Sequence, residues 1–279
     1  MSNESAATLR RQARRAASAS PTTLSEDELH DLAHDVEHEI KKEALSLPTQ
    51  TAPNLLTLSA PRNGNRKTIT HLPTPPDSPT MSRPVRLLIA SLGNPPPYHS
   101  TRHSAGHILL KSLATSLSLP PLQKSKSYGN GSVSEGLQYT LYQSPSLMNV
   151  SGPPLLKAWK FFLTQTSDPE AITGLVLLHD ELEASTAQLK IRRGESSARG
   201  HNGIKSVQAS FQAGGILSSL GQSFIKVGVG IGRPVSREKD DVSAYVLGPI
   251  TGQEKIKIEG VAHDLEALLG KEVARMGRA

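Results

Sequence analysis

The chain contains no cysteine, which excludes disulfide bonds, a cysteine nucleophile and every metal site with cysteine ligands. It also lacks any apolar run near the roughly 20 residues that a membrane-spanning helix requires. The longest candidate, Val85–Leu92, contains Arg86 and has the length of a strand. Aromatic residues make up only 4% of the 279 residues, whereas 20 prolines and 22 glycines indicate that part of the chain lies outside a packed core. We therefore expect one or two domains and no membrane partner.

The net positive charge of the chain comes from its later part. Residues 1–84 carry ten basic and ten acidic side chains, so residues 85–279 account for the whole formal net charge of +6. Such an excess of Lys and Arg is typical of proteins that bind a polyanion, often nucleic acid, because binding releases condensed counterions. Ordinary solubilising charge is the alternative that composition leaves open.

Residues 1–23 have the composition of a targeting segment. The first 20 are rich in Ser and Ala and carry four arginines against a single acid. This composition resembles a mitochondrial transit peptide, but Leu9 is the only bulky apolar residue, so a disordered basic tail is the alternative. Met81 stands just before the first strong strand. We therefore predict a mitochondrial location for the full chain and a cytoplasmic one for a product that starts at Met81.

An amphipathic helix is predicted over residues 24–48. Ser25 and Glu28 have the spacing of a capping box, and apolar residues recur every three to four positions before Pro48. Three histidines one helical turn apart also have the spacing of metal ligands: His30, His34 and His38. Acidic residues alternate with them, so we interpret them as a solvated polar face and predict no metal site. Residues 49–84, rich in Pro, Ser and Thr, are predicted to be a disordered linker.

Residues 85–279 are predicted to form a single α/β domain. Short apolar runs alternate with segments of helical periodicity, a pattern typical of a twisted, mainly parallel sheet flanked by helices. The sheet is expected to be mixed, because the connection between strands at 133 and 137–142 is short. The other predicted strands cover 85–92, 173–178, 187–193 and 224–231. The predicted helices cover 104–118, 153–163, 204–211 and 253–269.

Four polar segments lie next to these predicted strands and helices. In chain order they are Gly93–His103, Met148–Gly152, His179–Glu181 and Arg199–Gly203. Ligands of open α/β sheets bind beyond the carboxyl ends of the strands, so the four segments are expected to converge on one rim. Each segment by itself is weak evidence of a binding site, since a single Asn at the start of a helix is more often a cap than a ligand contact.

Taken together, the four segments resemble the motifs of the bacterial-type peptidyl-tRNA hydrolase family. The matching patterns are, in order, L-G-N-P…Y-x-x-T-R-H, L-M-N-x-S-G, H-D-E-L and G-H-N-G-x-K-S. The resemblance covers residues 85–270 and leaves residues 1–84 unaccounted for. It implies an enzyme that hydrolyses the ester bond between peptide and tRNA in peptidyl-tRNA released from stalled or aborted translation.

The resemblance also implies roles for individual residues. His103 matches the catalytic histidine that takes a proton from the attacking water, which an imidazole with an ordinary pKa of about 6.5 can do near neutral pH. Asp180 matches the acid that bonds the other ring nitrogen. Four further side chains are expected to bind the substrate: Asn94, Tyr98, Asn149 and Asn202. No cofactor and no metal is implied.

Three cations are expected to contact tRNA phosphates. Lys190 and Arg192 lie two residues apart on a predicted strand and therefore share a face, and Lys205 and Lys226 are near them by topology. We predict phosphate contacts for Lys190, Arg192 and Lys205, and a solvated strand face is the alternative for the two residues on the strand. The glycine-rich strand at 224–231 is followed by Pro234 instead of a helix, so no dinucleotide partner is predicted.

The chain also departs from the family pattern. Three prolines follow Asn94 in a loop one residue shorter than usual, Ser104 stands where the family usually has Asn, and the C-terminus is short. The prolines restrict φ and remove hydrogen-bond donors, so the loop beside His103 is expected to take a different path. An RNA-binding relative of the same fold without turnover is therefore kept as the alternative function. The protein is expected to act as a monomer.

Overall fold

The computed structural model describes residues 83–166 and 168–278. The predicted basic tail, the predicted helix over 24–48 and nearly all of the predicted linker lie outside the described residues. No helix within the two described ranges is long and apolar enough to cross a membrane.

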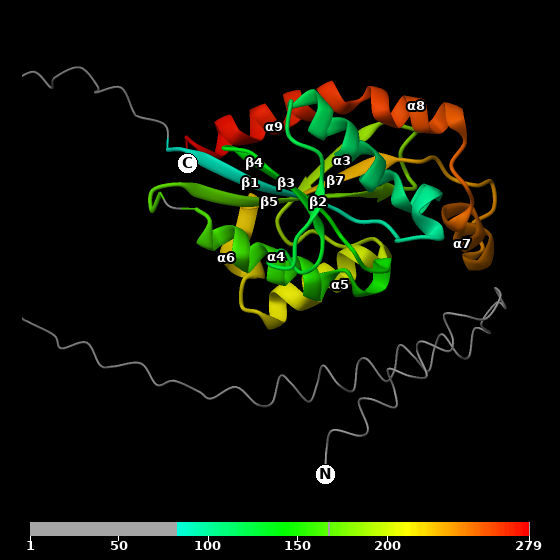
Figure 1. Cartoon of the computed structure of the whole chain (residues 1–279). Coiled ribbons are helices and arrows are strands. Elements are labelled where there is room, and N and C mark those ends of the chain that lie inside the picture. Colours follow the sequence, from blue (N-terminus) through cyan, green and yellow to red (C-terminus); the bar gives the residue numbers. More distant parts are fainter. Residues whose placement is uncertain (1–82, 167, 279) are drawn as a thin grey trace, which may run out of the picture. The chain divides into compact units, whose positions relative to one another are not determined.

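A seven-stranded sheet runs through the folded part of the chain in the order β2-β3-β4-β1-β5-β7-β6 (Figure 1). The four central strands pair in parallel, and the pairings on either side are antiparallel. The predicted α/β fold with a mixed, mainly parallel sheet is therefore confirmed. The strands are β1 (Val85–Ser91), β2 (Gln123–Lys124), β3 (Ser132–Glu135), β4 (Tyr139–Gln143), β5 (Ile172–Glu181), β6 (Leu189–Arg193) and β7 (Phe224–Gly230).

Helices cover both faces of this sheet (Figure 1). One face carries α3 (Ala105–Ser116), α8 (Gly252–Gly260) and α9 (Ala262–Met276), and the other carries α4 (Gly152–Thr164), α5 (Asn202–Ala213) and α6 (Leu217–Leu220). A further helix, α7 (Lys239–Leu247), stands at one end of the sheet (Figure 1). Four 3-10 turns connect these elements: Tyr98–Ser100, Arg102–Ser104, Met148–Val150 and Gly221–Ser223.

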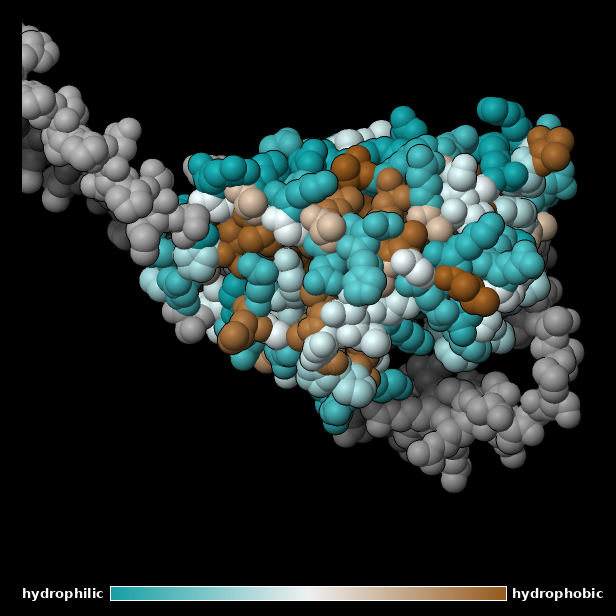
Figure 2. All heavy atoms as spheres, turned by 90° about the horizontal axis from the view of Figure 1, so that it is seen from above, coloured by the Kyte–Doolittle hydropathy of each residue, from teal (hydrophilic) through white to brown (hydrophobic). Residues whose placement is uncertain are grey.

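Strand β1 shows why the domain has two apolar layers. Leu87 and Ile89 belong to the cluster on the α3 and α9 side, and Leu88 and Ala90 belong to the cluster on the α4 and α5 side. All four are fully buried, because alternate residues of a strand point to opposite faces. The outer surface seen from the α8 and α9 side is mostly hydrophilic with separate hydrophobic patches (Figure 2), since the helices bury their apolar sides inward.

The structure differs from the predicted elements in several places. Strand β5 runs on to Glu181, beyond the predicted end at Leu178, because its ladder with β7 continues as far as the pair Glu181 and Gly230. The predicted helix over 253–269 is two helices that meet at Val261. Helix α7 was not predicted, since it buries none of its residues and so has no apolar stripe to detect.

Candidate active site

A cleft of about 790 Å³ opens beyond the carboxyl ends of β1 and β5. Its walls come from the segment before α4, the end of β5, the loop before α5, and α7. Parallel strands end at the same edge of a sheet, so motifs far apart in the sequence meet here. The sequence-predicted residues that line the cleft are Asn94, His103, Asn149, Asp180, Arg192, Asn202 and Lys205. Tyr98 and Lys190 are not among the lining residues.

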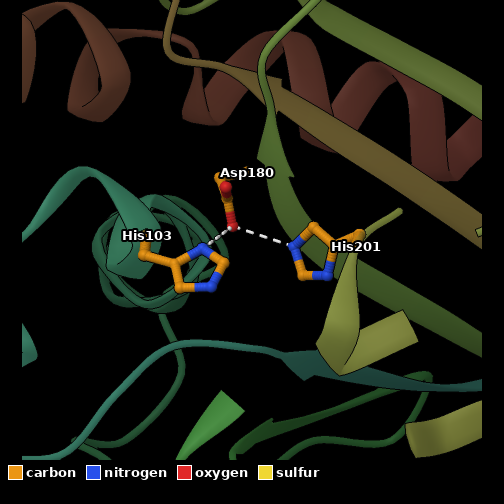
Figure 3. A group of neighbouring side chains, drawn as sticks. All are labelled: His103, Asp180 and His201. Atoms are coloured by element: carbon orange, nitrogen blue, oxygen red, sulfur yellow. Dashed lines mark hydrogen bonds and ion pairs between the residues drawn. The ribbon is translucent and has the colours of Figure 1, made fainter. Parts of the chain in front are cut away.

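His103 and Asp180 form the centre of the cleft. His103 lies in the 3-10 turn just before α3, and Asp180 lies at the end of β5. Nδ1 of His103 is 2.8 Å from Oδ1 of Asp180 (Figure 3). The other ring nitrogen points away from the carboxylate (Figure 3) and makes no hydrogen bond within the part of the chain that the structure describes. The Asp180 side chain is 3% exposed and that of His103 is 16% exposed, so substrate and water can reach only the imidazole.

His201 is a third member of this group that the sequence did not predict. Its Nε2 is 2.9 Å from the same Oδ1 of Asp180 (Figure 3). Its Nδ1 accepts the backbone N–H of Ile204 at 3.3 Å and so caps α5. A nitrogen that accepts carries no proton, so the neutral ring holds its proton on Nε2 and donates it to Asp180. The only sequence signal was its position one residue before Asn202 in the polar segment that opens α5.

The carboxylate sets the protonation of His103. Burial raises the pKa of Asp180, but the imidazoles of His201 and His103 outweigh it and hold the pKa well below its ordinary range. Asp180 is therefore an acceptor, and Nδ1 of His103 must be the donor. Burial lowers the pKa of His103, whereas the charge and hydrogen bond of Asp180 raise it, and the net direction is upward. The neutral ring consequently presents the lone pair of Nε2 to the cleft.

The asparagines differ in how firmly they are held. Asn94 is 5% exposed, and its Oδ1 accepts the backbone N–H of Met148 at 2.9 Å. Its NH₂ group makes no hydrogen bond to the described residues and remains available to a ligand. Asn149 and Asn202 are exposed at the rim. Together the three amides surround the cleft beside His103.

The loop after Asn94 is supported by Ser104, the residue that departs from the family pattern. Its Oγ accepts the backbone N–H of Asn94 at 3.0 Å and donates to the carbonyl of Tyr98 at 3.1 Å. The hydroxyl thus joins both ends of the proline-containing loop. The Tyr98 side chain is 47% exposed and stays outside the cleft. Its predicted role in substrate binding therefore has no support from this geometry.

The cleft has several cations with different partners. Arg192 is 2.6 Å from the buried Glu181, and Arg233 pairs with Glu183. Lys190 donates to the carbonyl of Glu183 instead of facing the cleft. Lys205 is exposed at the start of α5 and has no ion pair among the described residues. Of the three predicted phosphate contacts, Lys205 is therefore the most available to an anion.

A buried histidine, His179, also lines the cleft beside His201. His179 is 2% exposed, its ring lies edge-on to that of His201 at 5.0 Å, and its Nδ1 contacts the carbonyl of Asp180. Burial, followed by the neighbouring His201, lowers the pKa of His179 to about 4. This ring is neutral at neutral pH and adds no charge to the cleft.

His103, Asp180 and His201 are also the group of potential metal ligands found in residues 83–166 and 168–278. Their ligand atoms lie within 4.8 Å of one another. Two hydrogen bonds to Oδ1 of Asp180, from Nδ1 of His103 and from Nε2 of His201, already join the three side chains. The arrangement is therefore explained by hydrogen bonding without an ion.

The fold and the cleft define an open-sheet α/β protein in which an aspartate-oriented imidazole is available as a general base. A family model described as Peptidyl-tRNA hydrolase matches residues 88–277. A probable peptidyl-tRNA hydrolase of Schizosaccharomyces pombe is 38% identical over 174 residues, 62% of this chain and 75% of that protein. The peptidyl-tRNA hydrolase of Bacillus subtilis is 35% identical over 177 residues, with coverages of 62% and 84%.

A solved structure of a peptidyl-tRNA hydrolase is also similar to this chain. The crystal structure of peptidyl-tRNA hydrolase from Acinetobacter baumannii is 26% identical and matches with a TM-score of 0.53, covering 69% of this chain and 93% of that one. The chain belongs to the peptidyl-tRNA hydrolase family, and the resemblance seen in its four motifs is confirmed.

Proposed function

We propose that the protein hydrolyses the ester bond of peptidyl-tRNA with a water molecule that His103 deprotonates. Peptidyl-tRNA hydrolase activity follows from its membership of the family. The observation that carries the mechanism is the bond between Nδ1 of His103 and Asp180, which leaves Nε2 free at the cleft. The cleft contains no cysteine and needs no side-chain nucleophile, since water fills that role.

The proposed step moves one proton twice. Nε2 of His103 accepts a proton from water as the water oxygen attacks the ester carbonyl carbon. The bond between that carbon and the ribose oxygen then breaks, and the imidazolium returns the proton to the ribose oxygen. Asp180 stays ionised and favours the imidazolium while it exists. General-base help of this kind contributes about 10²–10⁴-fold to the rate.

The amide groups around His103 are suited to the reacting carbonyl and the peptide. The NH₂ of Asn94 is a donor held in place by the bond from Met148 to its oxygen. Such a preorganised donor stabilises negative charge that develops on a carbonyl oxygen. Asn149 and Asn202 at the rim provide donors and acceptors for the backbone of a peptide. Lys205, which has no ion pair with any residue that the structure describes, supports binding of a polyanionic tRNA at the same rim.

The test compares turnover with binding in a matched pair of variants. His103→Ala should lower kcat for release of an N-blocked amino acid from tRNA by at least about 10²-fold. Binding of deacylated tRNA should stay nearly unchanged. His99→Ala, an exposed histidine four residues earlier, is the control and should leave both unchanged.

The alternative is a binding protein of the same fold. An unmodified protein that binds tRNA but releases no amino acid would establish this alternative and refute the hydrolase. Retention of His103, Asp180 and the three cleft asparagines favours the hydrolase.

The proposed cellular role is recovery of tRNA from peptidyl-tRNA released by stalled or aborted translation, in mitochondria for the full chain. This location is supported only by the composition of residues 1–23. The test is the location of a tagged full chain compared with a tagged product that starts at Met81. Mitochondrial uptake of the full chain alone is expected, and an identical distribution of the two would refute the proposal.

A further inference from the structure

The side chain of Lys226 is buried, although it carries an ammonium group and lies in β7, the strand next to the edge strand β6. It is 1% exposed and lies 5.2 Å from the ring centroid of Phe224. No carboxylate forms an ion pair with it in residues 83–166 and 168–278. Removing such a charge from water is costly unless hydrogen bonds compensate for it. An apolar side chain of similar length would fit the sheet at lower cost, so stability alone does not account for a lysine here.

The hydrogen bond of Lys226 goes to a loop that forms part of the cleft. Nζ donates to the carbonyl oxygen of Ser196, and Nε2 of Gln208 in α5 donates to the same oxygen at 3.2 Å. Among the described residues, one further hydrogen bond joins the loop 195–200 to the rest of the chain: the backbone N–H of His201 donates to the carbonyl of Ala198 at 2.9 Å. The Ser196 carbonyl is therefore the point at which side chains of β7 and α5 hold the loop.

The loop needs an anchor because its backbone is unfavourable. Arg199 has a φ of 48° and Gly200 a φ of 85°, and the left-handed region costs a non-glycine residue about 1 kcal/mol or more. Ala198, Arg199 and Gly200 line the cleft, and the loop leads directly into His201. A displaced loop would thus move Arg199 and disturb the bond from His201 to Asp180.

We propose that Lys226 is a positioning residue, which fixes the loop 195–200 through the Ser196 carbonyl and so places Arg199 and His201 at the cleft. The proposal rests on the hydrolase function of the same cleft. Burial, together with the neighbouring Arg192, lowers the pKa of Lys226 to about 8, while Glu195 opposes this shift. The group is therefore still a charged donor at neutral pH, and hydrogen bonds from charged donors are the stronger ones.

The first test replaces Lys226 by Met, which keeps the length of the side chain and removes the charge. Lys226→Met should leave the thermal midpoint equal or raise it, because an unpaired buried charge is lost. Its kcat/KM for N-blocked aminoacyl-tRNA should fall about tenfold, the effect of losing one hydrogen bond to a charged group. Trypsin should cleave after Arg199 faster than in the unmodified protein, because the loop has lost the stronger of the two side-chain bonds to the Ser196 carbonyl.

The second test removes the other donor and does not disturb the sheet. Gln208→Ala on the partly exposed side of α5 should increase cleavage after Arg199 and lower kcat/KM by a smaller factor than Lys226→Met. This variant keeps the proposal testable if Lys226→Met fails to fold. Gln212→Ala, an exposed residue one turn later in α5, is the matched control and should change neither readout.

A lower thermal midpoint with unchanged kcat/KM and unchanged cleavage would show that Lys226 serves stability only, and would overturn the proposal. Unchanged cleavage and kcat/KM in both variants would overturn it as well. These failures would leave the hydrolase function intact, because that function is decided separately by turnover of the unmodified protein and by His103→Ala.

Discussion

His103 and His201 donate hydrogen bonds to one and the same oxygen atom, Oδ1 of Asp180, at 2.8 and 2.9 Å. Their ring centroids are 5.3 Å apart, so the carboxylate lies between two imidazoles. His201 is fixed in turn by its bond from the N–H of Ile204, which ties the arrangement to the start of α5. The orientation of the base thus depends on a helix that begins 99 residues later in the chain.

Replacing the carboxylate should affect the chemical step more than removal of His201. Asp180→Asn is expected to lower kcat by about 10²–10⁴-fold, because an amide neither stabilises the imidazolium nor enforces the proton on Nδ1. His201→Ala leaves the bond from His103 intact and should cost about tenfold. Single-turnover release from N-blocked aminoacyl-tRNA measures both. Equal losses in the two variants would contradict the separate roles given to Asp180 and His201.

The pH dependence of the rate should report His103. Asp180 raises the pKa of this imidazole above its ordinary value of about 6.5, and only the neutral ring accepts a proton. The rate is therefore expected to fall as the pH drops through a value above about 6.5. In Asp180→Asn the charge that raises the pKa is gone, so the acidic limb should move to lower pH. A profile that is flat from pH 5 to 8 would exclude His103 as the base.

The residue before the base links it to the wall of the cleft. Arg102 forms a two-pronged ion pair with Glu254, at 2.8 and 3.2 Å, and its guanidinium lies 4.4 Å from the ring centroid of Tyr245 in α7. Arg102→Lys keeps the positive charge but cannot form both hydrogen bonds of the guanidinium to Glu254. We expect this variant to lower the free energy of unfolding by about 1–3 kcal/mol and also to lower kcat.

An exposed ion pair on α8 provides the control for Arg102. Lys255 is 3.7 Å from Glu259, and both side chains are exposed, by 55% and 42%. Lys255→Ala should change the free energy of unfolding by less than about 1 kcal/mol and leave kcat unchanged. Denaturant titrations and turnover assays compare the two variants. A kcat of Arg102→Lys that equals that of the unmodified protein would show that the ion pair does not hold His103.

The neutral buried histidines should make the domain sensitive to acid. Burial, and then Lys111, lowers the pKa of His107 to about 3, while an unfolded histidine titrates at about 6.5. Below pH 6.5 the unfolded state binds a proton that the folded state does not, so stability falls until the folded pKa is reached. At pH 5 this one group should lower the free energy of unfolding by about 2 kcal/mol relative to neutral pH.

His107→Gln tests this assignment. Urea titrations at pH 7 and pH 5 should show a smaller loss of stability on acidification in His107→Gln than in the unmodified protein. The control is His263→Gln, since the side chain of His263 is 83% exposed. This variant should lose as much stability on acidification as the unmodified protein. An equal loss in His107→Gln would mean that His107 is not the group that takes up the proton.

The sequence predicted those features that depend on local pattern. The buried strands Val85–Ser91 and Phe224–Gly230 follow from short apolar runs, and the helix Ala105–Ser116 follows from helical periodicity. Features that depend on long-range contacts were missed. Strand β5 is extended by its ladder with β7, and His201 acquires its role only because α5 brings it to Asp180.

Lys226 shows most clearly what could not be predicted from the sequence. A lysine in a strand is expected to reach solvent, and the sequence placed it near the phosphate-binding cations. The structure buries it beneath the loop 195–200, since β6 and β5 pair with β7 on either side. Only the tertiary arrangement shows that its partner is a carbonyl oxygen instead of a phosphate.

The salt dependence of tRNA binding should distinguish free cations of the cleft from paired ones. Lys205 has no ion pair among the described residues, so Lys205→Gln should reduce the slope of log Kd against log salt by about one. Arg192 neutralises the buried Glu181, so a phosphate gains less from it, and Arg192→Gln should change the slope less. Lys271→Gln on the exposed side of α9 is the control and should leave the slope unchanged. If Lys205→Gln and Lys271→Gln gave the same slope as the unmodified protein, the start of α5 would not be a phosphate contact, because counterion release requires that the cation touch the polyanion.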